Sequence, residues 1–374
     1  MDIPRTRSRI VIKIGTNLLA DRTQGINLER IDSIARAVSS WHAQASQVAI
    51  VSSGAIGAGV AALQLRERPR TIPEKQATAA VGQPLLMVAY ENAFRKLGCP
   101  IGQMLLTKDD FANRARYVNA KNTFAALFER GVVPIVNEND SVAVEEIRLG
   151  DNDNLSALVA TLIEADLLVI LTDRDGLYSD DPSTNSRASL IPLVENITPQ
   201  IEKLAKNTRS ELGTGGMTTK VQAARRCVSA GIAVIIANGK KPNTLDELVR
   251  GRQTGTLFLP SQKKLNRRKQ WIGFVSTSRG FLVVDDGARN ALVRKHMSLL
   301  PSGILEIHGE FNANDTIAVR DASGKDIARG VTHFSSSDLA RIKGKKSSDI
   351  GSILSRKSHD EVIHCDNLVL IGEE

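Results

Sequence analysis

Short apolar runs alternate with longer amphipathic segments along the first 260 residues of the chain. Each run has the length of a strand and leads into a polar or glycine-containing turn. Strands that are apolar throughout are typical of a parallel sheet covered on both faces. The pattern predicts a three-layer α/β/α sandwich with a mainly parallel central sheet. The expected strands are Arg9–Gly15, Gln47–Val51, Ile101–Leu106, Val132–Val136, Leu167–Leu171 and Ile232–Ala237.

The segments between these strands have helical periodicity. In the first of them, Asn27 is a suitable N-cap for apolar residues that recur at helical spacing from Ile31 onward. Ligands of such sheets bind where the strands end, at their carboxyl edge. We therefore expect functional side chains in the loops at that edge. The other expected helices are Pro73–Leu97, Asn113–Arg130, Asn154–Ala165 and Thr218–Ala230.

The pattern changes after about Pro260. Five basic side chains fall between Ser261 and Gln270, which predicts a basic linker over residues 261–277. A solvated linker and a contact with nucleic acid both fit this run, although no aromatic side chain is interleaved with it. Short strands then predict a small β-rich domain over residues 278–357 and a loosely packed tail over 358–374. These strands are Phe281–Val284, Gly303–His308, Thr316–Arg320 and Ile327–Gly330. Residues 1–260 are the expected α/β domain.

Composition narrows the class of protein. The chain has 374 residues, of which 42% are hydrophobic and 24% charged, so it is expected to fold, with a core that is mostly aliphatic because aromatics make up only 4%. Three widely spaced cysteines argue against a disulfide framework or a zinc knuckle and fit a reducing cytoplasm. No apolar run is long enough to span a membrane, and no signal peptide follows Met1. We expect a cytoplasmic protein with no membrane association.

Two glycine clusters suggest a phosphate site. One lies in the expected loop of residues 52–59, and the other, Gly213 to Gly216, leads into a helix. Glycine lets backbone N–H groups approach an anion, and a glycine loop that opens a helix is a natural phosphate site, although tight turns have the same composition. The sequence lacks the P-loop, the dinucleotide fingerprint and the protein-kinase motifs.

Charged and amide side chains interrupt the apolar pattern at three places. Lys13 stands inside an apolar strand, where a lysine needs a partner or a function. Residues 137–140 and 151–154 alternate acidic and amide side chains without the spacing of an EF-hand. Helix capping explains one or two of these residues, but not all of them.

Five segments resemble the glutamate 5-kinase branch of the amino acid kinase family. The β-rich region resembles a PUA domain, which binds RNA in other proteins. Ser52 stands where threonine is common in the family, and Thr218 where serine is common, so both positions keep a hydroxyl group. The five segments, in order, are Ile12–Thr16, Ser52–Ala55, Asn137–Asp140, Gly150–Ala157 and Gly213–Lys220.

The resemblance implies ATP-dependent phosphorylation of the γ-carboxylate of L-glutamate to γ-glutamyl phosphate, the first step of proline biosynthesis, with Mg²⁺ as the cofactor that accompanies ATP. It implies that Lys13 and Lys220 are catalytic and neutralise the transferring phosphoryl group, while Asp153 holds both lysines in place. The implied glutamate-binding residues are Ser53, Asp140, Asn152 and Asn137. The implied ATP-binding residues are Lys13, Gly54, Thr172, Asp173, Thr214, Gly215, Gly216, Met217, Thr218, Thr219 and Lys220.

Partners and alternatives follow from the same resemblance. It implies a homo-oligomer (a dimer or tetramer), feedback inhibition by proline and a weak contact with RNA through the PUA-like domain. One alternative is a sister kinase that acts on aspartate, acetylglutamate or a nucleoside monophosphate. The other alternative is an RNA-binding protein with an inactive kinase-like domain. The presence of all three expected catalytic side chains, Lys13, Asp153 and Lys220, argues against it.

Overall fold

The computed structural model describes residues 8–21, 25–143, 152–207, 216–261, 272, 278–355 and 359–371, without the side chains of Ala20 and Asp21. The chain divides into two compact units, Met1–Lys264 and Leu265–Glu374. Each unit has its own sheet and its own hydrophobic core. No helix within the described ranges combines the length and the apolarity that crossing a bilayer requires.

An eight-stranded sheet forms the centre of the first unit, in the order β5-β6-β4-β1-β7-β9-β10-β8. Neighbouring strands are parallel except that β10 runs antiparallel to β9. This confirms the mainly parallel sheet. β8 and β10, of two and three residues, were not predicted because such short segments show no periodicity. The strands are β1 (Arg9–Ile14), β4 (Gln47–Ser52), β5 (Ile101–Leu106), β6 (Val133–Glu138), β7 (Leu167–Thr172), β8 (Leu193–Val194), β9 (Ala233–Asn238) and β10 (Thr256–Phe258).

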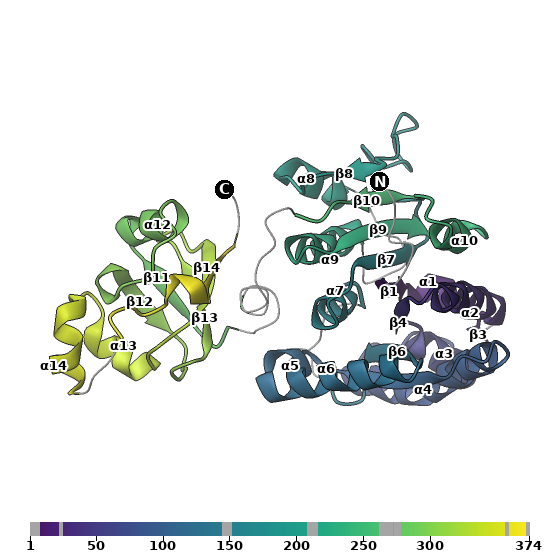
Figure 1. The fold of residues 1–374 in the computed structure, drawn as a ribbon, viewed down its shortest axis with the longest axis horizontal. Coiled ribbons are helices and arrows are strands. Elements are labelled where there is room, and N and C mark those ends of the chain that lie inside the picture. Colours follow the sequence, from purple (N-terminus) through teal and green to yellow (C-terminus); the bar gives the residue numbers. More distant parts are fainter. Residues whose placement is uncertain are drawn as a thin grey trace. The chain divides into compact units, whose positions relative to one another are not determined.

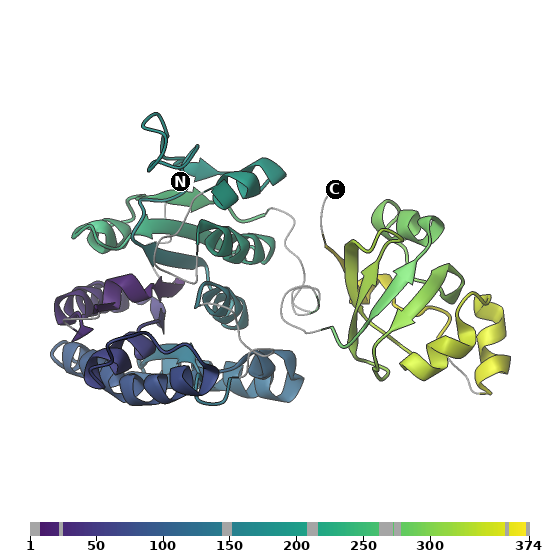
Figure 2. The same ribbon diagram turned by 180° about the vertical axis from the view of Figure 1, so that it is seen from behind.

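Helices cover both faces of this sheet, as the apolar strands predict. Figure 1 shows one helical layer on each side of the strands, and Figure 2 shows the same layers from behind. One layer contains α1 (Thr16–Leu19), α2 (Leu28–Ala43), α4 (Ile72–Arg95) and α10 (Thr244–Val249), and the other contains α6 (Arg114–Glu129), α7 (Asn152–Leu162) and α9 (Met217–Ser229). The remaining elements are β2 (Ala20–Asp21), β3 (Gly25–Ile26), α3 (Ala55–Ala62), α5 (Lys108–Ala112) and α8 (Pro199–Asn207).

The alternation of side chains along β1 directs Lys13 toward α7. Ile10, Ile12 and Ile14 belong to the core that α2 and α4 share with the sheet. Successive side chains of a strand point to opposite faces, so Lys13 projects from the other face. The interruption of the apolar run thus places an ammonium group under α7, close to the end of the strand.

The glycine-rich segment after β4 differs from the expected loop. Gly54 adopts a left-handed conformation, with φ at +108°, and α3 begins directly after it. α3 then packs against α4 through backbone contacts, because a Cβ atom added to Gly59 would lie 1.9 Å from the Thr78 carbonyl oxygen. A Cβ atom added to Gly82 would lie 1.9 Å from the Ala55 carbonyl oxygen. Gly59 therefore permits close helix packing, and only Gly54 remains at the strand end as a candidate for phosphate contact.

The second unit contains a five-stranded sheet in the order β12-β11-β13-β14-β15. β11 and β13 are parallel, and the other neighbours are antiparallel. Figure 2 shows α13 and α14, in yellow, side by side at one end of this sheet. The strands are β11 (Phe281–Val284), β12 (Ile304–His308), β13 (Thr316–Arg320), β14 (Asp326–Val331) and β15 (Leu368–Leu370), and the helices are α12 (Asp286–Val293), α13 (Ser336–Ile342) and α14 (Ile350–Leu354). Short 3-10 helices span Pro301–Gly303, Ser347–Asp349 and Cys365–Asn367.

The C-terminal region differs from the expected loose tail. β15 pairs with β14, and Val362 and Ile363 are fully buried in the core of the second unit. The prediction of a loose tail was wrong for residues 359–371 because their apolar side chains complete this core. Most of the expected basic linker lies outside the described residues, but Ile272 packs against Val331 and Val369.

Candidate active site

Five neighbouring parallel strands end at the same edge of the first sheet. β1, β4, β6, β7 and β9 all have their carboxyl ends there, because parallel strands share one direction. The described site residues predicted from the sequence lie in these strand ends or in the turns and helices that follow. This is the edge at which open α/β sheets bind their ligands.

Three charged side chains converge under the first turns of α7 and α9. The Lys13 ammonium lies 2.7 Å from Oδ1 of Asp153, and the Lys220 ammonium lies 3.1 Å from Oδ2. The Thr219 hydroxyl also donates to Oδ2, at 2.8 Å. The side chains of the two lysines are 8% and 7% exposed, and that of Asp153 is fully buried. The structure thus brings together the three residues predicted to be catalytic, although they are far apart in the sequence.

The charge balance of this cluster suits an anionic ligand. Burial by itself would raise the pKa of Asp153, but the charges of Lys13 and Lys220 outweigh it and, with hydrogen bonds from Lys13 and Thr219, hold the pKa of this carboxyl below its ordinary value. Two ammonium groups beside one carboxylate leave a net positive charge. The N-termini of α7 and α9 add positive ends of helix dipoles. The cluster is therefore a favourable place for phosphate oxygens.

A directed hydrogen-bond network lies next to the charged cluster. The Asn152 amide donates to the Ser53 hydroxyl at 2.8 Å and to the Asn137 side-chain oxygen at 3.1 Å. The Asn137 amide in turn donates to the Gln83 side-chain oxygen at 2.8 Å. Because Ser53 accepts from Asn152, its hydroxyl keeps its own proton for a further acceptor. Three residues predicted to bind glutamate thus form one connected network with a fixed direction.

α4 contributes polar side chains to this region that were not among the predicted site residues. Gln76 donates to the backbone oxygen of Ala143 at 3.1 Å, and the Tyr90 hydroxyl lies 2.9 Å from the Ser52 hydroxyl. Gln76, Gln83 and Tyr90 are spaced by seven residues, which places them on one face of the helix. That spacing was visible in the sequence. The spacing indicates a polar stripe along one face of the helix predicted over Pro73–Leu97.

The remaining predicted residues differ in what they contact. The Thr172 hydroxyl donates to Asp173 at 3.1 Å at the end of β7. Partial burial raises the pKa of Asp173, but hydrogen bonds from its own backbone, Thr172 and Asn17, with the charge of Lys240, hold that pKa below its ordinary value. Asp140 is half-buried in the turn after β6.

The glycine loop before α9 is described only in part. Gly216 is the N-cap of α9, and Met217 is buried. The Thr218 hydroxyl donates to the carbonyl oxygen of Ala205 at 3.2 Å, so it contacts the last turn of α8. Thr214 and Gly215, which the family resemblance assigns to the nucleotide site, lie outside the described residues.

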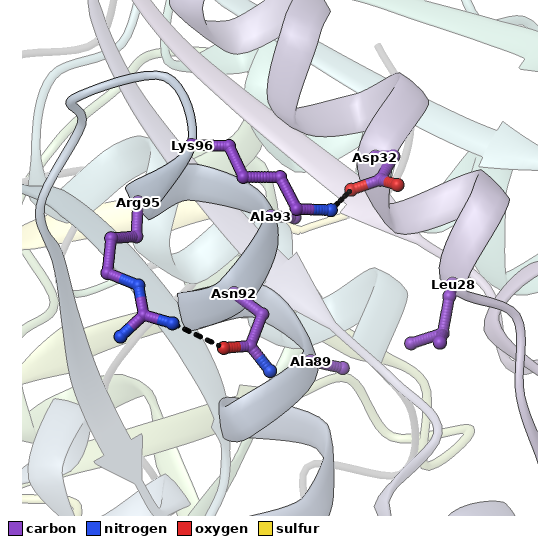
Figure 3. Close-up of a pocket in the computed structure, with 7 residues that line it drawn as sticks. All are labelled: Leu28, Asp32, Ala89, Asn92, Ala93, Arg95 and Lys96. Atoms are coloured by element: carbon purple, nitrogen blue, oxygen red, sulfur yellow. Dashed lines mark hydrogen bonds and ion pairs between the residues drawn. The ribbon is translucent and has the colours of Figure 1, made fainter.

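A pocket of 340 Å³ lies between α2 and α4, and it is lined by residues other than those of the candidate active site (Figure 3). Lys96 pairs with Asp32 across it at 3.5 Å, and Arg95 donates to Asn92 at 3.1 Å. Both contacts lie at the surface, where water and salt screen the charges, so they contribute little to stability. None of the predicted site residues lines this pocket. It offers a surface whose substitution should leave the candidate active site intact.

Comparison with known proteins matches both units. Residues 8–238 match the Amino acid kinase family, and residues 280–354 match the PUA domain. A glutamate 5-kinase of Moorella thermoacetica is 47% identical over 364 residues, which cover 97% of this chain and 96% of that protein. A glutamate 5-kinase of Syntrophotalea carbinolica is 48% identical over 362 residues, covering 97% of each chain. Among solved structures, a UMP kinase from Ureaplasma parvum aligns with 68% of this chain and 99% of its own, at 18% identity and a TM-score of 0.48.

Proposed function

The chain belongs to the amino acid kinase family, and within it to the glutamate 5-kinases, and from this membership we infer that it transfers the γ-phosphoryl group of ATP to the γ-carboxylate of L-glutamate. The product is γ-glutamyl phosphate, and the reaction is the first step of proline biosynthesis. The observation that carries this function in the structure is the pair of buried ammonium groups, Lys13 and Lys220, on one carboxylate beside the amide network.

The chemistry requires positioning and charge rather than a base. The γ-carboxylate of glutamate, with a pKa near 4.3, is already an anionic nucleophile at neutral pH. One of its oxygens forms a bond to the γ-phosphorus while the bond from that phosphorus to the bridging oxygen of ADP breaks. Catalysis then consists of aligning two anions and stabilising the charge on the transferring group. Lys13 and Lys220 are placed to supply that charge, with Asp153 as their positioning residue.

Two adjacent subsites follow from this assignment. The phosphates of ATP belong beside the lysine cluster and the N-terminus of α9, with Gly54, Thr172 and Asp173 on the same sheet edge. Glutamate belongs beside the amide network, where Ser53 and Asn152 present a hydroxyl and an amide. The ATP-binding roles of Gly216, Met217, Thr218 and Thr219 and the glutamate-binding roles of Asp140 and Asn137 are part of the same proposal.

A Mg²⁺ ion bound to ATP fits the residues at this edge. Magnesium keeps several water ligands and is commonly held by substrate phosphates rather than by a cage of protein carboxylates. Asp153 is engaged by both lysines, and the groups of three potential metal ligands in the described part of the chain lie in the second unit. The ion would supply further charge neutralisation of the phosphates when bound. Its ligands are proposed to be phosphate oxygens and water.

Further partners are proposed on the same basis. Val81, Leu85 and Val88 form an exposed apolar stripe on α4, which supports a homo-oligomer that light scattering of the purified chain can detect. Proline is the proposed feedback inhibitor. The PUA domain supports a weak contact with RNA, which should weaken steeply with salt if it forms. The proposed location is the cytoplasm, because all three cysteines are free thiols.

The function is tested by trapping the product. The purified chain is incubated with ATP, Mg²⁺, glutamate and hydroxylamine, which converts an acyl phosphate to a hydroxamate, with and without proline. We expect γ-glutamyl hydroxamate and stoichiometric ADP. Parallel reactions with aspartate, acetylglutamate and UMP separate this kinase from its sister enzymes. Product from one of those substrates and none from glutamate would refute the proposal.

Substitution of Gln83 by alanine is expected to raise the KM for glutamate about fivefold with a smaller effect on kcat. The change removes the acceptor that orients Asn137, and a net hydrogen bond contributes about 1 kcal/mol. Gln83→Glu keeps an oxygen within reach of the Asn137 amide and should retain most of the affinity. Initial rates over a range of glutamate concentrations provide the measurement.

Asn92→Ala, on the same helix but at the pocket of Figure 3, is the matched control and should leave both constants unchanged. An unaltered KM in Gln83→Ala would remove Gln83 from the glutamate subsite. A loss confined to kcat would assign it to the phosphate side instead.

A further inference from the structure

Three of the six histidines of the chain gather in one region of the second unit. His333 lies just after β14, and His359 and His364 lie in the segment that leads to β15. The backbone N–H of His333 donates to the Val362 carbonyl oxygen at 2.9 Å, so the two segments are held side by side by the main chain. The β-bridge between Leu299 and Ile363 fixes the second segment from its other side. Main-chain hydrogen bonds therefore hold the segments that carry these histidines close together.

The side chains of this region form a group of potential metal ligands. The rings of His333 and His359 lie 3.9 Å apart between centroids and are tilted by 31°. One ring nitrogen of each and a carboxylate oxygen of Glu361 lie within 4.8 Å of one another. The His333 side chain is 12% exposed and that of Glu361 22% exposed, whereas His359 is open to solvent. Two of the potential ligands are thus mostly buried, and the third is exposed.

The orientation of His333 is set by a backbone contact. Its Nδ1 atom lies 3.2 Å from the Glu361 carbonyl oxygen, which can only accept. In the tautomer in which Nδ1 donates to this oxygen, Nε2 keeps the lone pair that a metal ion requires. Nδ1 also lies 4.0 Å from the Glu361 carboxylate, so the ring stands beside both groups of Glu361. Histidines that bind metals are commonly oriented in this way, by a hydrogen bond from the other ring nitrogen to a carbonyl or carboxylate.

We propose that His333, His359 and Glu361 bind a divalent transition-metal ion of the Zn²⁺ type, with water completing a four-coordinate site. Two imidazoles and a carboxylate are ligands that suit Zn²⁺ rather than Mg²⁺ or Ca²⁺, which prefer sets of oxygen ligands. Bonds of about 2.0–2.2 Å require the ligand atoms to move closer together than they lie now. The exposed side chain of His359 can make most of that movement. The ion would then join the end of β14 to the segment before β15.

A second group of potential ligands and an isolated pair provide internal comparisons. His364, Cys365 and Asp366 also have ligand atoms within 4.8 Å of one another, but they are consecutive residues. On β12, His308 lies 2.8 Å from Glu306, an exposed histidine–carboxylate pair outside any described group of three potential ligands. Variants of these residues show whether binding needs the proposed three ligands or merely any histidine beside an acid.

The test uses the full chain, stripped with a chelator and free of nucleotide. Zn²⁺ is titrated by isothermal calorimetry, and Co²⁺ is used as a spectroscopic probe of the ligand set. We expect one ion per chain, and we expect His333→Ala and His359→Ala each to weaken binding by about 100-fold or more. His308→Ala and Cys365→Ser should bind as the parent does, and the Co²⁺ spectrum should lack a thiolate charge-transfer band.

Several outcomes would overturn the proposal. These are the absence of binding by the parent chain, an affinity unchanged in His359→Ala, and loss of binding in Cys365→Ser. Because His359 is exposed, its replacement should leave the fold intact, and thermal unfolding without metal verifies this. A further expected result is that Zn²⁺ raises the unfolding temperature of the parent but not of His359→Ala, since a ligand that binds only the folded state stabilises it.

Discussion

Replacing Lys220 or Lys13 by methionine is expected to lower kcat by about 100- to 1,000-fold while the fold persists. Methionine keeps an unbranched apolar stem in the buried position but removes the positive charge. The transferring phosphoryl group then loses one of the two ammonium groups placed to stabilise it. The KM for glutamate should change much less, because the amide network stays complete. Hydroxamate formation under saturating substrates gives kcat, and circular dichroism monitors the fold.

Lys96→Met is the matched control for this prediction. The Lys96 side chain is 68% exposed and pairs with Asp32 on the surface, so its charge has no part in the site. It should leave kcat unchanged. Turnover within a few-fold of the parent in Lys13→Met or Lys220→Met would show that the lysine in question does not stabilise the reaction.

Asp153→Asn is expected to lower the free energy of unfolding of the first unit by about 3–5 kcal/mol and to abolish most of the activity. The substitution leaves two ammonium groups buried without a counter-charge and turns an amide N–H₂ group toward one of them. Urea unfolding can be followed by the fluorescence of Trp41, which is buried in α2. A Trp271→Phe background removes the only other tryptophan of the chain.

The pH dependence of stability provides a second readout for Asp153. The pKa of this carboxyl is below its ordinary value in the folded chain. The contribution of the ionised carboxyl to the free energy of unfolding is therefore complete above the unfolded pKa of about 3.9. This contribution is lost as the pH falls through the lower pKa of the folded state. Asparagine does not titrate, so the difference in the free energy of unfolding between the parent and Asp153→Asn should become smaller only at acidic pH. Asp32→Asn, which breaks an exposed pair, is the control and should change neither the stability nor its pH dependence. Equal stabilities of the parent and Asp153→Asn at neutral pH would contradict the role assigned to the charged cluster.

The first sheet and its functional edge could be predicted because they depend on local patterns. β7 and β9 begin with continuous apolar runs, and β1 is apolar apart from Arg9 and Lys13. The rule for the carboxyl ends of parallel strands then needs only the identity of the strands. The meeting of Lys13 with Lys220 needed the family resemblance as well, because no periodicity relates residues so far apart in sequence. The structure supplies the contacts, with Asp153 between the two lysines.

Other features depend on tertiary contacts that the sequence does not display. Gly59 looked like part of a loop because glycine favours turns, but here it lets α3 approach α4. Gln83 lies inside a predicted helix, and its partner Asn137 comes from a strand more than fifty residues away in sequence, at a separation of 54. Ile363 and Leu368 stand near the chain end in a polar context, yet they complete the second core. In each case the deciding neighbour is remote in sequence.

The first turn of α7 has a mechanical consequence for the two subsites. Asn152 and Asp153 are consecutive residues, one bonded to the hydroxyl and amide network and the other to both ammonium groups. A helix moves as a rigid unit, and its neighbouring side chains point about 100° apart, so one displacement of α7 shifts the contacts of both proposed subsites together. If the proposed subsites hold, one element therefore links the positions of the two reactants, although Ser53, Lys13 and Lys220 come from other segments.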